Sequence, residues 1–272
     1  MGAATMAEPL PATHCRDPSC AVESLAAAPA GQPRDAAALS TMLELRGLRF
    51  SWPGAAAPTL AIDELTLAAG RTVFLHGPSG CGKSTLLGLL AGVLLPSSGQ
   101  VSLLGRSWAG LRASRRDAFR ADHVGYIFQQ FNLLPYLSVL DNVRLPCRFS
   151  RRRAQRATAR GEEGGAERLL ERVGLPASLW ARPAAQLSVG QQQRVAAARA
   201  LIGAPELVIA DEPTSALDAD RRDAFMDLLL GECAAAGSTL IFVSHDQRLA
   251  ARFSQQLSLP AINRAAVAAG AA

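Results

Sequence analysis

The sequence has little lysine: of its 28 lysine and arginine residues, Lys83 is the only lysine. Aromatic residues are scarce as well, at 5%, and the five cysteines have no repeated spacing. A disulfide framework is not expected in a chain of this length with scattered cysteines. Cys15 and Cys20, with His14 beside them, are too few and too irregularly spaced to close a metal site.

Long hydrophobic runs are also absent from the sequence. The longest apolar stretch, residues 86–95, has about half of the roughly 20 residues that a membrane span needs. No basic segment followed by an apolar one opens the chain, because Glu8 and several prolines interrupt it. The sequence therefore predicts neither a signal peptide nor a transmembrane helix, and it favours a cytoplasmic location.

Composition allows one large domain, or a core with a subdomain, because 49% of the 272 residues are hydrophobic and 19% are charged. Residues 1–40 are rich in alanine and proline without any period, and we predict a disordered tail there. Residues 41–260 are expected to form the folded domain. Within it, the arginine-rich region of about 112–190 is predicted to be an inserted helical subdomain, and residues 261–272 a short C-terminal tail.

Two kinds of strand pattern indicate the fold class. Apolar residues alternate over residues 43–52 and 60–67, which predicts half-buried strands. Continuous apolar runs at residues 72–75, 207–210 and 239–243 are typical of a parallel sheet covered on both faces. The predicted fold is α/β: a mixed sheet core with an N-terminal antiparallel β part and an inserted helical subdomain.

Residues 77–84 read G-P-S-G-C-G-K-S between a predicted strand and a leucine-rich helix, and they match the phosphate-loop pattern G-x-x-x-x-G-K-[ST]. The glycines let backbone N–H groups face phosphates, and the helix start adds its positive end. Lys83 supplies a compact ammonium to the β- and γ-phosphates, and the Ser84 hydroxyl is suited to Mg²⁺. A glycine-rich turn that only caps a helix does not explain why the single lysine falls here. The candidate nucleotide-binding residues of this loop are Gly77, Pro78, Ser79, Gly80, Cys81, Gly82, Lys83, Ser84 and Thr85.

Acidic residues follow one of the predicted buried strands. Asp211 and Glu212 come directly after residues 207–210, and ligands of open parallel sheets bind beyond the carboxyl ends of the strands. We assign Asp211 to the Mg²⁺ shell and Glu212 to polarising the attacking water as general base. His245 follows residues 239–243 in the same way, where it would contact the γ-phosphate. Taken singly, each residue also fits a helix cap or a surface position.

A phosphate loop followed by an acidic strand also occurs in kinases, GTPases and helicases. Residues 187–191 read L-S-V-G-Q, followed by Q-Q-R, and here the sequence resembles the ABC ATPase family, whose signature is usually LSGGQ. The resemblance extends from about residue 42 to about residue 254, with Val189 standing where the family has glycine. It implies the ABC-ATPase fold of P-loop NTPases, ATP and Mg²⁺ as cofactors, and ATP hydrolysis.

The resemblance also implies roles for residues outside the phosphate loop. Gln129 corresponds to the Q-loop glutamine that approaches Mg²⁺, and Trp52 to an aromatic residue that stacks on adenine. Ser188, Gly190 and Gln191 would point at the γ-phosphate bound by a second copy of the chain. From the residues alone, Ser188 and Gln191 are spaced as a capping box, which is equally consistent with a well-capped helix and nothing more.

Residues 124–135 read V-G-Y-I-F-Q-Q-F-N-L-L-P and resemble the branch that serves lipoprotein release, macrolide export and the cell-division cassette FtsE. That resemblance implies an exporter or mechanotransmission system, in which a homodimer docks on integral membrane permease subunits at the inner face of the cell membrane. By the same analogy, residues 131–136 would line the groove for a permease coupling helix. Ordinary packing of this segment is an equal alternative.

Two other functions remain open from the sequence. An ATP-gated switch of an envelope complex would use the same ATPase motifs without net transport. A soluble ABC ATPase acting on DNA or ribosomes would fit the net charge of +5 and the pI of 9.3. Proteins of that kind usually have two cassettes, long coiled coils or zinc modules, none of which occurs in this sequence, so no nucleic-acid partner is expected.

Overall fold

The computed structural model describes most of the predicted folded domain. The predicted tail over residues 1–40, apart from Ser40, lies outside the described residues, as do Cys15 and Cys20 and residues 266–272 at the C-terminus. The described residues are 40–159, 165–215 and 217–265.

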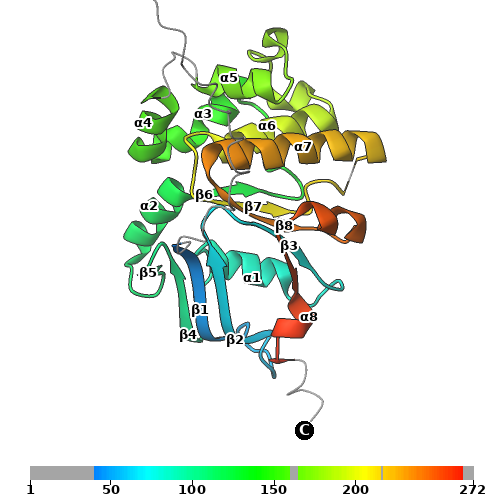
Figure 1. Ribbon diagram of the computed structural model, residues 1–272. Coiled ribbons are helices and arrows are strands. Elements are labelled where there is room, and N and C mark those ends of the chain that lie inside the picture. Colours follow the sequence, from blue (N-terminus) through cyan, green and yellow to red (C-terminus); the bar gives the residue numbers. More distant parts are fainter. Residues whose placement is uncertain (1–39, 160–164, 216, 266–272) are drawn as a thin grey trace, which may run out of the picture. The chain divides into compact units, whose positions relative to one another are not determined.

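Four strands form an antiparallel sheet (Figure 1). In sheet order they are β2 (Leu60–Ala68), β1 (Thr41–Phe50), β4 (Ser98–Leu103) and β5 (Arg106–Ser107). Leu45 of β1 pairs with Leu65 of β2 on one side and with Val101 of β4 on the other, and all three are buried. Because alternate residues of a strand point to the same face, these side chains bury one face of the sheet. The predicted N-terminal antiparallel part is confirmed.

Five strands form a second sheet in which every neighbouring pair is parallel. In sheet order they are β6 (Val124–Ile127), β7 (Leu207–Asp211), β8 (Thr239–Val243), β3 (Thr72–His76) and β9 (Gln255–Ser258). The three continuous apolar runs are confirmed as β3, β7 and β8. Because the strands are parallel, their carboxyl ends share one edge, where the phosphate loop and the acidic pair both begin.

Helices cover both faces of the parallel sheet (Figure 1). Val73 and Leu75 of β3 pack in the same cluster as the leucines of α1 (Lys83–Leu90), whereas Phe74 between them packs with α6 (Val189–Leu201) and α7 (Ala219–Ala236). Alternate residues of β3 therefore face different helices. The helix of the phosphate loop and the helix of the signature segment lie on opposite faces of one sheet.

The region 112–190, predicted to be a helical subdomain, is not helical throughout, because residues 124–127 form β6 of the parallel sheet. A glycine is required in this strand: a Cβ at Gly125 would lie 2.2 Å from the carbonyl oxygen of Ala200 in α6. The remaining elements are α2 (Ala113–His123), α3 (Val139–Phe149), α4 (Arg151–Ala159), α5 (Gly165–Arg172), α8 (Leu259–Ile262) and the 3₁₀ turns η1 (Ala177–Leu179), η2 (Ala184–Gln186) and η3 (Gln247–Arg252).

Arg153 of α4 is buried where α4 meets α6 and β6. Its guanidinium donates hydrogen bonds to the backbone carbonyl oxygens of Val124 (3.3 Å), Ala200 (2.6 Å) and Ile202 (2.7 Å). Burial lowers the pKa of Arg153 to about 10, so the group stays charged at neutral pH. These charge-assisted hydrogen bonds hold α4 against the end of α6.

Glu206, which precedes β7, accepts hydrogen bonds from His123 (2.7 Å), Arg152 (2.6 Å) and Arg156 (2.8 Å). Burial by itself raises the pKa of Glu206, but the hydrogen bonds from His123 and Arg152 outweigh it and lower the pKa to about 2. Since the folded pKa lies below the ordinary value of 4.5, the carboxylate stabilises the fold at neutral pH. This contribution is lost as the pH falls from 4.5 towards 2.

We expect Glu206→Gln to reduce the free energy of unfolding by about 1.5–3 kcal/mol at neutral pH, the range for hydrogen bonds to a charged group. Urea unfolding of both proteins measures the difference, which should shrink when the pH is lowered to about 3.5. The matched control is Asp63→Asn, because Asp63 pairs with Arg49 and Arg264 on the surface and should contribute less than about 1 kcal/mol. A difference that is the same at both pH values would contradict the charged state of Glu206.

Candidate active site

The phosphate loop lies between the end of β3 and the start of α1. Gly80 and Gly82 have φ values of 79° and 100°, which only glycine adopts without strain. Gly82 precedes the first turn of α1, and among the described residues no side chain caps this helix start. The first N–H groups of α1 are therefore available to an anion. Pro78 and Ser79 are exposed and Cys81 is half-buried, so one side of the loop faces solvent.

Lys83 is buried inside this loop, with 7% of its surface exposed. Its Nζ donates hydrogen bonds to the backbone oxygens of Gly77 (3.1 Å) and Pro78 (3.0 Å). A Cβ at Gly77 would lie 2.8 Å from the Cys81 sulfur, which shows how closely the loop folds around the lysine. The structure thus places one compact cation in the loop that leads to the uncapped N–H groups at the start of α1, an arrangement suited to phosphate.

Ser84 and Asp211 meet at the carboxyl edge of the sheet. The Ser84 hydroxyl hydrogen-bonds Asp211 Oδ2 at 3.4 Å, and the Tyr126 hydroxyl lies near the Asp211 carboxylate and interacts with it. Burial and the neighbouring Glu212 both raise the pKa of Asp211. A divalent cation would favour the charged carboxylate, and hydroxyl and carboxylate oxygens are the donors that Mg²⁺ prefers. The residues present therefore fit a magnesium ion.

Glu212 and His245, predicted from two different strands, lie next to each other. His245 Nε2 is 2.8 Å from Glu212 Oε1, and about half of the histidine side chain is exposed, against 19% of the glutamate side chain. Glu212 has a φ of 47°, uncommon for a residue with a side chain, and its N–H donates to the carbonyl oxygen of Val243 at 3.1 Å. The ends of β7 and β8 thus hold an acid–base pair beside Asp211.

Gln129 and Trp52, two of the residues assigned by family resemblance, are both exposed. Gln129 lies in the turn after β6. Two and three positions later, Phe131 and Asn132 have φ values of 59° and 47°. Trp52 follows β1, is 47% exposed and meets the ring of Phe50 edge-on, with 5.1 Å between the ring centroids. The positions are compatible with contacts to a nucleotide, and the roles of Gln129 and Trp52 stay predictions.

The signature segment begins α6 with the predicted capping box. Ser188 Oγ accepts a hydrogen bond from the Gln191 N–H (3.4 Å), and Gln191 Oε1 accepts one from the Ser188 N–H (3.0 Å). A Cβ at Gly190 would meet nothing within 4 Å, and Val189 is 51% exposed. Because the box occupies the N–H of Gln191, the N–H groups of Val189 and Gly190 remain for an anion.

The predicted site residues fall into two groups in space. Lys83, Ser84, Asp211, Glu212 and His245 lie along the carboxyl edge of the parallel sheet, joined by the contacts given above. Within the described part of the chain, no hydrogen bond or ion pair connects the signature segment to the phosphate loop. Their helices α6 and α1 cover opposite faces of the sheet.

Tyr126 is a site residue that the sequence analysis missed. Its hydroxyl lies near Asp211, and its ring stacks on the ring of Phe128, with 4.2 Å between the centroids. Phe128 directly precedes Gln129. Tyr126 pairs with Ile209 across β6 and β7, and side chains two residues apart on a strand share a face, so Tyr126 and Asp211 face the same side. The sequence shows the short stretch that forms β6, but it does not show that β7 is the neighbour of this strand in the sheet.

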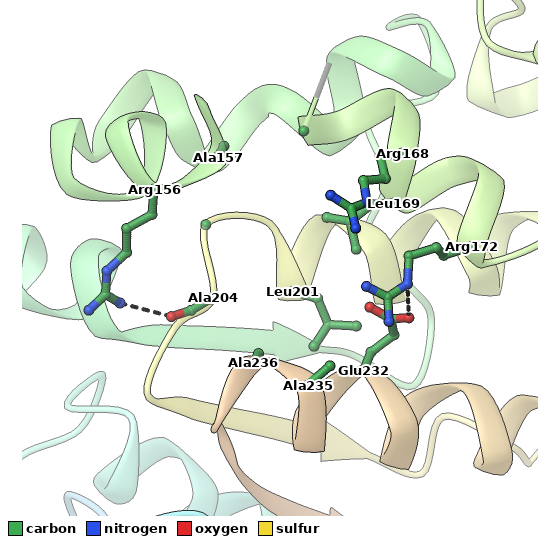
Figure 2. Close-up of a pocket in the computed structure, with 12 residues that line it drawn as sticks. Arg156, Ala157, Arg168, Leu169, Arg172, Leu201, Ala204, Glu232, Ala235 and Ala236 are labelled. Carbon is green, nitrogen blue, oxygen red and sulfur yellow. Dashed lines mark hydrogen bonds and ion pairs between the residues drawn. The ribbon is translucent and has the colours of Figure 1, made fainter. Parts of the chain in front are cut away.

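A cavity of about 410 Å³ lies away from these residues, between α4, α5, α6 and α7 (Figure 2). It borders Gly203 and Ala204, which precede β7, and is therefore at the amino edge of the parallel sheet. Arg172 at its wall pairs with Glu232 at 2.7 Å, and Arg156 donates to the Ala204 carbonyl oxygen. Size alone does not make this cavity the active site, because the phosphate loop and the acidic pair lie at the other edge.

Over the stretches of chain that the structure describes, no helix is both long and apolar enough to cross a membrane. The fold and the residues along the carboxyl edge define an ATP-binding P-loop ATPase. The sequence model of the family described as ABC transporter matches residues 60–215. The chain belongs to this family and is one of its ATP-binding ATPase domains.

Relatives agree with this assignment. The chain is 47% identical over 201 residues to the uncharacterized ABC transporter ATP-binding protein YbbA of Escherichia coli K12, covering 72% of this chain and 83% of YbbA. It is 41% identical to the lipoprotein-releasing system ATP-binding protein LolD of Hydrogenovibrio crunogenus, covering 74% and 85%. The match to the macrolide export ATP-binding/permease protein MacB of Rhodopseudomonas palustris HaA2 is 41% identical and covers 80% of this chain but only 32% of MacB.

A solved structure shares the fold. It is the dimeric post-hydrolysis state of the ATP-binding cassette MJ0796 bound to ADP and Pi, with a TM-score of 0.69 and 33% sequence identity, and the match covers 80% of this chain and 94% of that one. The predicted ABC-ATPase fold and the resemblance to the branch of lipoprotein release and macrolide export are confirmed.

Proposed function

We propose that this chain is the ATP-binding and hydrolysing subunit that powers an ABC transporter of the lipoprotein-release or macrolide-export kind. It works as a homodimer at the cytoplasmic face of the cell membrane, docked on integral membrane permease subunits. The observation that carries the hydrolytic part is the Glu212–His245 pair, 2.8 Å apart, beside Asp211 and the phosphate loop.

In the proposed mechanism, the residues at the carboxyl edge bind the phosphates, hold the metal ion or activate the attacking water. Lys83 and the N–H groups of the loop bind the β- and γ-phosphates, as ammonium and N–H groups do in phosphate loops. Ser84, Asp211 and Gln129 would hold Mg²⁺, which would supply positive charge to neutralise the phosphate oxygens. Glu212 accepts a proton from the attacking water, and His245, whose ring nitrogen lies against Glu212, orients that carboxylate and contacts the γ-phosphate.

The proposed homodimer follows from the position of the signature segment. The N–H groups of Val189 and Gly190 point out of a capped helix start, yet α6 and α1 lie on opposite faces of the sheet. A helix start that faces solvent favours an anion brought by another molecule. A second copy would bring its own phosphate loop with bound ATP, so Ser188, Gly190 and Gln191 of one chain complete the site of the other.

A cleft beside β6 provides the proposed contact with the permease. It has a volume of about 230 Å³, and Phe128, Leu145, Pro146 and Phe149 are among its lining residues. Phe149 is 73% exposed, an unusual position for a large apolar side chain. The segment 131–136 was predicted either to line a groove or to pack in the ordinary way. Phe131 is buried and packs in the core, whereas Tyr136 is 74% exposed.

Affinity purification of the tagged chain from detergent-solubilised native membranes tests the proposal. We expect a permease with few membrane spans and a large external domain to co-purify. The double variant Tyr136→Ala, Phe149→Ala should lose this partner while it still binds ATP, because neither residue belongs to the nucleotide site. Recovery of soluble proteins or nucleic acid alone would leave the ATPase assignment intact and overturn the membrane assignment.

A further inference from the structure

Helix α6 carries two buried polar side chains that the mechanism above leaves without a task. Gln193 is 1% exposed and Arg199 is 9% exposed. Burying an amide or a guanidinium is costly unless its donors are used. Both side chains donate hydrogen bonds to backbone carbonyl groups in turns that adjoin site residues, the first beside Glu212 and the second beside Gln129.

Gln193 reaches the turn of the general base. Its Nε2 donates to the carbonyl oxygen of Pro213 at 2.9 Å, and Pro213 directly follows Glu212. Glu212 has a φ of 47°, and a residue held in the left-handed region persists only where its surroundings enforce it. The amide of Gln193 is one such restraint, because it fixes the carbonyl group on the far side of the strained residue.

Arg199 reaches the turn that follows Gln129. Its guanidinium donates to the carbonyl oxygens of Asn132 (2.7 Å) and Phe131. Phe131 and Asn132 are consecutive residues with positive φ, 59° and 47°. Burial lowers the pKa of Arg199, but arginine remains charged in proteins, so these hydrogen bonds are charge-assisted and strong.

One rigid helix therefore begins at Ser188 and contacts two strained turns, one beside Glu212 and one beside Gln129. We infer that Gln193 and Arg199 are positioning residues, through which α6 sets both turns relative to the signature segment. A rotation of α6 would move the two turns together. In the proposed homodimer, on which this consequence rests, ATP contacted by Gln129 and Glu212 in one site would orient Ser188 in the other site.

Neighbouring residues of α6 provide matched controls. The Gln192 side chain also donates to backbone carbonyl groups, those of Ala184 (3.3 Å) and Leu187 (3.2 Å). Leu187 begins the signature segment, and neither residue belongs to the turns beside Glu212 and Gln129. Arg194 likewise donates to the Gly174 carbonyl oxygen at 3.2 Å. Each proposed positioning residue thus has a control residue of the same amino-acid type, on the same helix, whose side chain also donates to backbone carbonyl groups.

Steady-state hydrolysis tests the inference in single variants. We expect Gln193→Met and Arg199→Met to lower kcat by about 10-fold or more, while the KM for ATP changes little, because the phosphate loop is untouched. Circular dichroism confirms that each variant is folded at the assay temperature. Gln192→Met and Arg194→Met should keep kcat within about twofold. Arg199→Lys, which retains one charged donor, should restore part of the rate. Equal effects of the positioning and control variants, or an unchanged kcat in Gln193→Met and Arg199→Met, would overturn the inference.

A second readout is independent of turnover. In the Glu212→Gln background, sedimentation with ATP and Mg²⁺ should show dimers for the parent and for its Gln192→Met derivative, but about 10-fold weaker association for its Arg199→Met derivative. Equal association of all three would refute the coupling through Arg199. If the Glu212→Gln parent itself stays monomeric, the proposed homodimer fails, whereas the kcat comparison still decides the positioning roles.

Discussion

Replacing Lys83 by alanine is expected to lower the affinity for ATP by about 100-fold, the largest binding effect that we predict for a single substitution. The ammonium is buried in the phosphate loop, 3.0 Å and 3.1 Å from two backbone carbonyl oxygens, so it has a fixed position from which to meet phosphate. Two charge-assisted hydrogen bonds from the ammonium to phosphate oxygens of ATP, of about 1.5 kcal/mol each, account for a change in affinity of this size. Isothermal titration calorimetry with ATP measures this loss of affinity.

The control for this prediction is Lys83→Arg, which keeps the charge. We expect it to bind ATP almost as poorly as the alanine variant, because a planar guanidinium does not fit a loop in which a single methyl group at Gly77 would already collide with the Cys81 sulfur. A chain that uses arginine for every other basic residue would then have a physical reason for its only lysine. Unchanged nucleotide affinity in Lys83→Ala would refute the phosphate-loop assignment.

Much of the site could be predicted because its determinants are local in sequence. The phosphate loop needs glycines, a lysine and a helix start within eight residues, and the structure has them in the predicted order. The capping box of Ser188 and Gln191 likewise depends on residues three positions apart. The meeting of Glu212 and His245 followed from a general rule, since both residues leave parallel strands at the same edge.

The parts that could not be predicted depend on which strands and helices are neighbours. Residues 124–127 are four apolar residues within a helical region, too few to distinguish a strand from a helix by periodicity. Without β6 in place beside β7, nothing in the sequence connects Tyr126 with Asp211. Gln193 lies twenty positions before Pro213, and Arg199 sixty-eight positions after Phe131, so their hydrogen bonds appear only when α6 is packed on the sheet.

The Glu212→Gln variant is expected to hydrolyse ATP about 100-fold to 10,000-fold more slowly, the range attributed to a general base, while its affinity for ATP stays within about threefold. The amide cannot accept the proton of the attacking water but occupies the same space, and the phosphate loop and the Ser84–Asp211 contact are unchanged. Phosphate release with saturating ATP and Mg²⁺ measures the rate. Glu64→Gln, an exposed glutamate in β2, is the control and should hydrolyse ATP normally.

The same variant tests the homodimer, because slow hydrolysis preserves the ATP that would lie between two chains. Light scattering after size-exclusion chromatography should show a dimer with ATP and Mg²⁺ and a monomer with ADP, whose missing γ-phosphate leaves the start of α6 without its anion. The two readouts answer separate questions. A slow variant that stays monomeric with ATP would retain Glu212 as the base and reject the shared site, whereas a dimer that hydrolyses at the normal rate would show that another residue activates the water.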